Sequence, residues 1–288
     1  KEFKRIQKLV AKNRKEGREI VVVMGVGFVG AVMAGVIADS ETKNTVTLSS
    51  SKGMVRQAHH DTSSCPPLEG VGGGLSSSLV ARRSSLSSLS PIASGPSPKY
   101  PKFVIGVQRP STRSYWKIPY LNRGIAPVEA EDPEVAPLIA RCVNEKKTLI
   151  ATYTEDALTL ADCVVVDVQC DFHKETLGNC RQGYADIKAL EDSLKIIGEK
   201  IPKDCLVLIE TTVPPGTTEY IAYPILKKAF DRRFSKPDQQ KTENKKGTKN
   251  PSPIASGPEP LLSHSYERVM PGREYVASIR DFWRVCSG

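Results

Sequence analysis

The sequence lacks the features that would identify a metalloprotein, a membrane protein or a secreted protein. Its seven cysteines form no C-x-x-C pair and no His–Cys cluster at zinc-ligand spacing. No apolar run approaches the roughly 20 residues that a membrane-spanning helix needs. The amino-terminal segment is charged and has no apolar core of a secretory signal. We therefore expect no metal site, no membrane partner and a cytoplasmic protein with reduced thiols.

Aromatic residues are also scarce, at 6% of the chain, and they do not interleave with a basic stripe as a base-stacking surface requires. The net charge of +9 comes from two local segments. Residues 1–18 carry eight basic and two acidic residues, and residues 227–249 carry nine basic and three acidic residues. Solvated helix faces and a basic linker explain this distribution, so we expect no nucleic-acid partner.

Residues 19–39, EIVVVMGVGFVGAVMAGVIAD, contain the most informative pattern. A buried β-run leads into a G-x-G-x-x-G turn and then into small apolar residues, which is the strand–turn–helix context of a dinucleotide fingerprint. The first glycine permits the tight turn, the second lets the backbone approach a pyrophosphate, and the third lets the helix pack on the strand. The cofactor-binding residues predicted here are Gly25, Gly27, Phe28, Val29 and Gly30.

Strand and helix patterns alternate along the rest of the chain, after an amphipathic basic lead-in helix at 1–18. Further strands are predicted at 103–108, 148–153, 163–168 and 205–210. Helices are predicted at 133–144, 155–161, 184–197 and 220–230, and Gly198 is predicted to cap the third of these. The alternation predicts an α/β fold with a doubly wound, mostly parallel Rossmann-type sheet in the order 3-2-1-4-5-6.

Two segments of low complexity interrupt this pattern. The first is rich in Ser, Gly and Pro, the second is basic and contains Pro, and both include the heptapeptide SPIASGP. Such compositions cannot bury enough apolar surface to offset the entropy lost on ordering. We predict a disordered insertion at 41–100 and a basic, Pro-rich insertion at 232–260 within one domain at 19–288.

Three further motifs follow the glycine-rich turn in order. They are KIPYLNRGIAPVEAEDPEV at 117–135, IETTVPPGTTEY at 209–220 and SHSYERVMPG at 263–272. Together with the turn, they resemble the NAD-binding half of the UDP-glucose/GDP-mannose dehydrogenase family, the nucleotide-sugar dehydrogenases. The stretch SYERVMPGREYVASIRDFWRVCSG is most similar to branches that act on nucleotide-linked N-acetylhexosamines or related sugars. The resemblance covers 20–39, 101–230 and 261–288.

The resemblance implies two NAD-dependent hydride transfers, which convert the C6 alcohol of a UDP-sugar to the uronic acid through an aldehyde held on a cysteine. By motif, Thr212 matches the family threonine near the nicotinamide and the catalytic water. Glu267 matches the glutamate that has acid/base or water-positioning work, so both are predicted catalytic residues. Taken alone, Thr212 can instead cap the next helix and Glu267 can pair with Arg268. Val168, at the end of a predicted strand, is a further expected cofactor contact together with Thr212.

The cofactor end of the sequence departs from the fingerprint at one position. An Asp or Glu is expected at the end of the second strand, where it binds the adenosine ribose hydroxyls. Here the strand ends in Gln108, followed by Arg109. Gln108 can still bind a ribose, whereas Arg109 can accommodate a 2′-phosphate. NAD is the expected cofactor, and NADP stays open as an alternative.

The length of the chain is the second departure. It stops at Gly288, whereas the family continues into a central and a C-terminal domain that carry the catalytic lysine and cysteine. Cys286 has no His or Lys motif nearby that would activate a thiol, so we interpret it as structural. We expect a portion that is incomplete as an enzyme and dimeric only in the full-length protein. A non-catalytic dinucleotide-binding module is the alternative.

Overall fold

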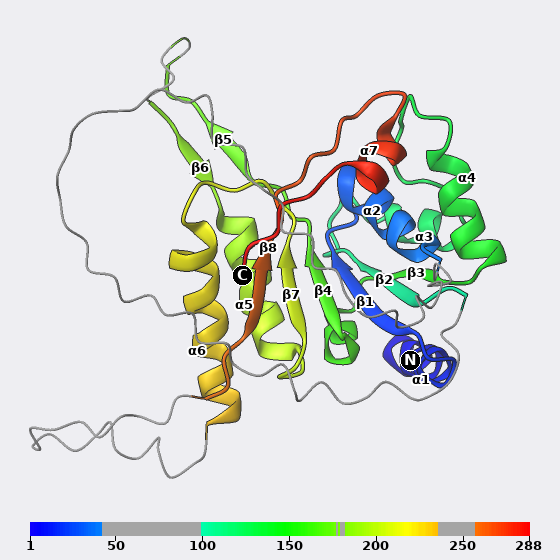
Figure 1. Ribbon diagram of the computed structural model, residues 1–288, viewed down its shortest axis with the longest axis horizontal. Helices are drawn as coiled ribbons and strands as arrows, with labels where there is room; N and C mark the ends of the chain where they lie inside the picture. The colour runs from blue at the N-terminus through cyan, green and yellow to red at the C-terminus, as the bar shows by residue number, and fades with distance from the viewer. Residues whose placement is uncertain (42–98, 177, 179–181, 236–256) are drawn as a thin grey trace, which may run out of the picture. The chain divides into compact units, whose positions relative to one another are not determined.

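A computed structural model describes residues 1–41, 99–176, 178, 182–235 and 257–288. Most of the two predicted insertions, with most of both SPIASGP copies, lies outside these residues. A six-stranded sheet forms the centre of the described part (Figure 1). Its strands, in sheet order, are β3 (Leu149–Thr152), β2 (Lys102–Val107), β1 (Glu19–Met24), β4 (Cys163–Val166), β7 (Leu206–Ile209) and β8 (Leu261–His264).

Every neighbouring pair of this sheet is parallel. Counted along the chain, its strands have the order 3-2-1-4-5-6, which confirms the predicted doubly wound Rossmann-type α/β fold. The strands form from continuous apolar runs because parallel strands of this kind are buried on both faces. In β1, Ile20, Val22 and Met24 pack into one hydrophobic cluster, and Val21 and Val23 pack into the other.

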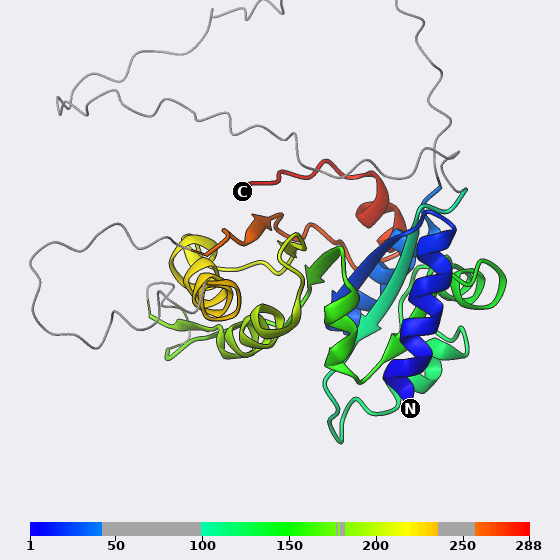
Figure 2. The same ribbon diagram turned by 90° about the horizontal axis from the view of Figure 1, so that it is seen from below.

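Helices cover both faces of the sheet (Figures 1 and 2). The cluster that contains Ile20 also contains residues of α1 (Glu2–Lys15), α5 (Lys188–Lys200) and α6 (Tyr223–Phe234). The cluster that contains Val21 includes residues of α2 (Phe28–Asp39), α3 (Lys117–Asn122), α4 (Val135–Ala140) and α7 (Tyr275–Asp281). Three short helical turns complete these layers: η1 (Arg141–Glu145), η2 (Glu155–Leu160) and η3 (Thr218–Ala222).

The predicted helix at 184–197 is wrong at its start. Tyr184–Asp186 is strand β6, which pairs antiparallel with β5 (Asp171–His173). The helix begins only at Lys188, whose backbone N–H donates to the Asp186 carboxylate at 3.1 Å. This local bond competes with an earlier helix start, as Asp side chains do near helix ends.

Gly198 is not the C-terminal cap, because α5 continues to Lys200. The glycine lies where α5 meets α6, and a Cβ there would stand 2.8 Å from the Cβ of Ala229. Its function is therefore close packing of two helices. Helix α6 runs to Phe234, past the predicted start of the second insertion at 232.

The sequence did not locate α3, α7, the β5–β6 hairpin or the position of β8. Among the described residues, no helix is both long and apolar enough to cross a membrane. In the same part of the chain, no three His, Cys, Asp or Glu side chains gather as a metal site requires.

Candidate functional site

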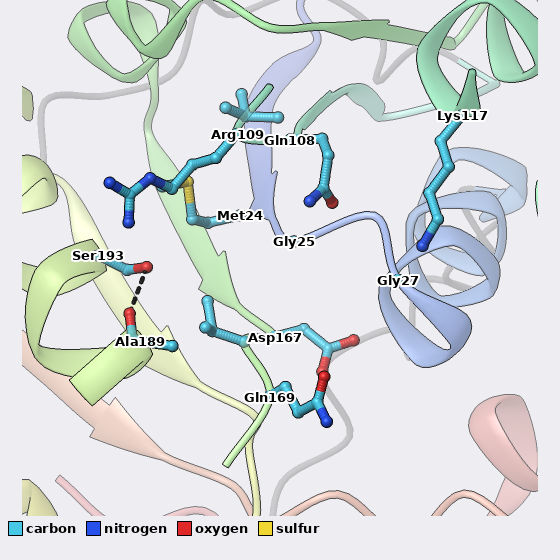
Figure 3. Close-up of a pocket in the computed structure, with 12 residues that line it drawn as sticks. Met24, Gly25, Gly27, Gln108, Arg109, Lys117, Asp167, Gln169, Ala189 and Ser193 are labelled. Carbon is cyan, nitrogen blue, oxygen red and sulfur yellow. Dashed lines mark hydrogen bonds between the residues drawn. The ribbon is translucent and has the colours of Figure 1, made fainter. Parts of the chain in front are cut away.

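A cavity of about 290 Å³ opens at the carboxyl ends of β1, β2 and β4 (Figure 3). Strand β1 has β2 on one side and β4 on the other. The chain therefore builds the sheet outward from β1 in one direction and then, from β4, in the opposite direction. Open α/β sheets bind ligands at such a switch point. The wall contains five residues predicted as cofactor contacts: Gly25, Gly27, Gln108, Arg109 and Val168. It also contains Lys117, Asp167 and Gln169, which the sequence did not single out.

The three glycines of the turn do different work. Gly25 has a φ of +103°, and a Cβ there would stand 2.1 Å from the Asp167 carbonyl oxygen. At Gly30, a Cβ would stand 1.8 Å from the Gly25 carbonyl oxygen. These two positions are fixed by protein packing. At Gly27, by contrast, a Cβ would meet no protein atom within 4 Å, so this glycine faces open space where a ligand can approach.

Helix α2 begins directly after Gly27, which is its N-cap residue. No side chain caps it, and its first turn holds no acidic residue. The first N–H groups of a helix have no partner within the helix and carry a partial positive charge. Lys117 points its ammonium group toward Gly27 from α3 (Figure 3). These donors and charges fit the pyrophosphate of a dinucleotide.

Gln108 and Arg109 follow the carboxyl end of β2. The backbone N–H of Val26 donates to Oε1 of Gln108 at 3.0 Å, so this side chain holds the glycine-rich turn in place. The amide nitrogen of Gln108 is the group that remains for a ribose hydroxyl. Arg109 is exposed at the rim, and its guanidinium extends toward Ser193 of α5 (Figure 3).

Phe28 and Val29 lie in the first turn of α2, outside the cavity wall. The Phe28 ring stacks on Tyr275 of α7 with a centroid distance of 5.0 Å. The hydroxyl of Tyr275 donates to the Phe28 carbonyl at 2.8 Å. Neither side chain lines the cavity, so these two predicted contacts are expected to reach a cofactor through their backbone N–H groups.

Val168 lies just beyond β4, where a threonine fastens it to the next strand. Thr211 Oγ1 accepts the Val168 N–H at 3.0 Å and donates to the Val168 carbonyl at 2.8 Å. Thr211 is buried and immediately precedes the predicted catalytic residue Thr212. The sequence signal was the Thr-Thr pair before Val-Pro-Pro-Gly, of which only the second residue was selected.

Thr212 is exposed just beyond the carboxyl end of β7, and Glu267 is half-buried a few residues after β8. Neither lines the cavity, although the two strands are neighbours and end at the same edge. The Glu267 carboxylate accepts the backbone N–H of Val269. Arg268 donates instead to the Trp283 carbonyl at 3.3 Å. The alternatives of a helix-capping Thr212 and a Glu267–Arg268 pair are absent from the described contacts.

Asp167, one of the three cavity residues that the sequence did not single out, lies within the run CVVVDV, which has the pattern of a strand. Its Oδ2 atom is buried and has no hydrogen-bond partner among the described residues. Burial, with added repulsion from Glu267 and Glu210, raises the pKa of Asp167 to about 7. Glu210 has a cation partner, Arg284, at 2.6 Å.

Cys286, predicted as structural, is exposed and so is not a packed core thiol.

The fold, the glycine-rich turn and the uncapped helix define a dinucleotide-binding Rossmann-type domain. The sequence profile of the UDP-glucose/GDP-mannose dehydrogenase family, NAD binding domain, matches residues 102–262. This is more than half of the chain, and the chain belongs to that family. Its cofactor is NAD. The matched range begins after the glycine-rich turn, so the geometry of the turn supports the same conclusion independently.

This chain spans less than half the length of each of the following relatives. UDP-N-acetyl-D-mannosamine dehydrogenase from Pyrococcus horikoshii is 26% identical over 153 residues, which cover 53% of this chain and 28% of the relative. The crystal structure of NDP-N-acetyl-D-galactosaminuronic acid dehydrogenase from Methanosarcina mazei Go1 matches with a TM-score of 0.58 and 23% identity, covering 98% of this chain and 41% of that one. A UDP-glucose dehydrogenase from Pyrobaculum islandicum matches at 0.50 and 15%, covering 93% and 39%. These structures show the fold alone.

Proposed function

We propose that residues 1–288 form the cofactor-binding portion of a nucleotide-sugar 6-dehydrogenase of the cytoplasm. The substrate is a UDP-linked sugar, and the best candidates are UDP-N-acetylhexosamines. Its C6 alcohol is oxidised to the uronic acid in two NAD-dependent steps. Family membership and the similarity to a UDP-N-acetyl-D-mannosamine dehydrogenase support this assignment.

The observation that carries the proposal is the open space above Gly27 at the uncapped start of α2. NAD, when bound, supplies the hydride acceptor. In the proposed site, the α2 N-terminus binds the pyrophosphate and Lys117 adds positive charge. Gln108 holds the turn and offers its amide nitrogen to the adenosine ribose, with Arg109 at the rim.

Thr212 and Glu267 are the proposed catalytic residues. Glu267 lies close enough to Asp167 for the two carboxylates to repel each other, which supports a position of Glu267 at the cavity's edge. There it can hold a water molecule or exchange a proton with the sugar hydroxyl. Thr212, on the neighbouring strand end, can orient the same water with its hydroxyl.

The remaining parts of the enzyme are proposed to correspond to regions of the longer relatives that have no counterpart in this chain. The chain spans 28% of the Pyrococcus relative, so most of that protein has no counterpart here. We assign the nucleophilic cysteine, the sugar site and the homodimer contacts to those parts. The domain at 19–288 with its two insertions is then the cofactor unit, preceded by the basic helix at 1–18.

Substitution of Gly27 tests the cofactor site directly. Gly27→Ala is expected to weaken NADH binding at least about tenfold, equivalent to about 1.4 kcal/mol, because the methyl group enters the space of the pyrophosphate. The melting temperature is expected to stay unchanged, since no protein atom lies within 4 Å of the new Cβ. Calorimetric titration and a thermal melt of both proteins measure the two effects.

The unmodified chain provides the decisive control. Absence of NADH binding at millimolar cofactor would overturn the assignment, as would equal affinity of the Gly27→Ala variant. With UDP-N-acetylmannosamine and NAD, residues 1–288 alone are expected to produce no NADH. Turnover by this chain would contradict the assignment of the nucleophile to other sequence, whereas binding without turnover in any longer form would favour a non-catalytic module.

A further inference from the structure

A single acidic side chain lines the described cavity, and it lies where an anion is expected. The Oδ2 atom of Asp167 is buried without a partner. It stands 2.9 Å from the position that a Cβ of Gly30 would take, so the carboxyl group lies against the first turn of α2. The same turn provides the free N–H groups for the pyrophosphate. Two anionic groups therefore compete for one helix end.

The electrostatic environment of the Asp167 carboxylate differs before and after the cofactor binds. In the free protein, the partial positive charge at the start of α2 stabilises the ionised carboxylate. A bound pyrophosphate takes up these N–H groups and brings its own negative charge close to Asp167. Like charges a few ångströms apart in a poorly solvated site favour protonation of the weaker acid. Asp167 is that acid, because phosphodiester groups stay ionised.

We propose that Asp167 takes up a proton when NAD binds, so that the domain holds the cofactor with a neutral acid beneath the glycine-rich turn. The inference rests on the cofactor site proposed above. It assigns a positioning function to Asp167: the protonated form removes the repulsion and can donate a hydrogen bond within the site.

Titratable groups near Asp167 lie at the end of β7, beyond β8 and on α7. Glu210 at the end of β7 and Glu267 beyond β8 repel its carboxylate, and burial together with these two groups raises the pKa of Asp167 to about 7. Arg284 neutralises part of the charge of Glu210 through their 2.6 Å contact. Tyr275 of α7 also lies near these acids. Burial, together with repulsion from Asp167 and Glu267, raises the pKa of Tyr275 and keeps its hydroxyl protonated.

Two cations face the cavity from the opposite side. Lys117 of α3 points toward Gly27, and Arg109 lies at the rim, next to the space for the cofactor (Figure 3). Neither makes an ion pair with Asp167 in the described contacts. They attract the phosphates more than they stabilise the buried carboxylate. The balance of neighbours therefore favours a protonated Asp167 in the complex.

The sign of the pH dependence follows from this balance. The pKa of Asp167 is higher in the complex than in the free protein, so affinity is greatest below the pKa of the free protein. It falls as the pH rises above that value and levels off above the pKa of the complex. One linked proton limits the fall to about tenfold per pH unit.

Calorimetric titration with NADH tests the uptake on the unmodified chain. Measurements between pH 6 and pH 9, each in two buffers of different ionisation enthalpy, give both the affinity and the number of protons bound. We expect uptake approaching one proton near pH 8 and a fall in affinity of up to about tenfold per pH unit. Asp167→Asn, which is similar in shape and neutral, is expected to bind NADH without proton uptake and with a flat pH profile.

Asp171→Asn is the matched control. Asp171 is an exposed neighbouring aspartate that binds the Gln169 amide at 2.8 Å, and its substitution is expected to leave the proton count unchanged. Three results would overturn the proposal: no proton uptake by the unmodified chain, a full pH slope in Asp167→Asn, or an equal loss of affinity at all pH values in that variant. Failure to bind NADH even at pH 6 would overturn the cofactor site as well. Binding that ignores pH would overturn only the proton uptake.

Discussion

The two ends of α2 each carry an aspartate nearby, and the two aspartates have opposite environments. Asp39 ends the helix, where burial alone would raise its pKa, but hydrogen bonds from Arg141 and Lys146 hold that pKa at about 2. Arg141 binds it through two contacts of 2.8 Å, and Lys146 binds it at 2.7 Å. Asp167, against the first turn, has no cation partner and a pKa raised to about 7.

The helix dipole makes this difference informative. A carboxylate is unfavourable at the C-terminal end of a helix and favourable at the N-terminal end. At the unfavourable end two cations bind the aspartate, whereas at the other end no described cation binds Asp167. A structural acid is therefore fully paired, whereas the acid beside the open cavity stays unpaired and able to titrate. Such unpaired, perturbed groups in a cleft are typical of functional sites.

The largest loss of stability is expected from a substitution in the first turn of α2, next to Asp167. Gly30→Ala puts a Cβ where the Gly25 carbonyl oxygen stands 1.8 Å away, so either the turn or the helix must move. We expect the free energy of unfolding to fall by about 3 kcal/mol or more, with loss of NADH binding. Urea denaturation followed by circular dichroism measures the change. Gly27→Ala is the matched control, and equal stability of the two variants would contradict the packing argument.

The carboxyl end is tested by removing one cation of the Asp39 cluster. Arg141→Ala leaves a partly buried carboxylate with only Lys146, and we expect a loss of about 2 kcal/mol at pH 7. The native pKa of Asp39 is lower than in the unfolded chain, so its stabilisation is complete above about pH 4. That stabilisation disappears as the pH falls toward about 2. The difference between variant and parent is therefore expected to shrink between pH 7 and pH 3.

Arg280→Ala provides the control for this experiment. Arg280 forms a 2.8 Å ion pair with Glu134, but both side chains are substantially exposed. Exposed pairs contribute less than about 1 kcal/mol, so this variant is expected to be nearly as stable as the parent. A loss at Arg141 that is equally large at pH 7 and pH 3 would show that packing, and not the charge of Asp39, accounts for it.

The sequence predicted the sheet well because its strands carry their own signal. Runs such as VVVM and CVVV are apolar throughout since helices cover both faces. The β5–β6 hairpin carries no such signal: its residues are largely exposed, including Phe172 and Tyr184. It forms through pairing of two short segments that are separated in the chain, and propensity alone assigned the second to the following helix.

The site was predictable where backbone conformation dictates the residue type, or where a residue lies at the end of a predicted strand, as Gln108 and Val168 do. The glycines of the turn are required locally, and their spacing identified them. The environments of Asp39 and Asp167 depend on residues far away in sequence. Arg141 and Lys146 reach Asp39 from beyond the first insertion, and Glu267 approaches Asp167 only through the parallel order of β4, β7 and β8. No spacing rule reveals which acid acquires a partner.

The smallest effect, a change in NADH affinity, is expected from Arg109 at the rim of the cavity. Arg109 is exposed, so its attraction for the cofactor acts through water and is screened by salt. Arg109→Ala is expected to weaken NADH binding about two- to threefold at low salt, with no difference at high salt. NADPH binding is expected to fall further, because the proposed site would place the 2′-phosphate at the adenosine end, near Arg109. Titration of both cofactors at two salt concentrations measures these changes, with Arg113→Ala as an exposed control outside the cavity wall. A salt-independent loss above tenfold for NADH would mean that Arg109 closes over the cofactor, and the amino end would then pair its anion as completely as the carboxyl end pairs Asp39.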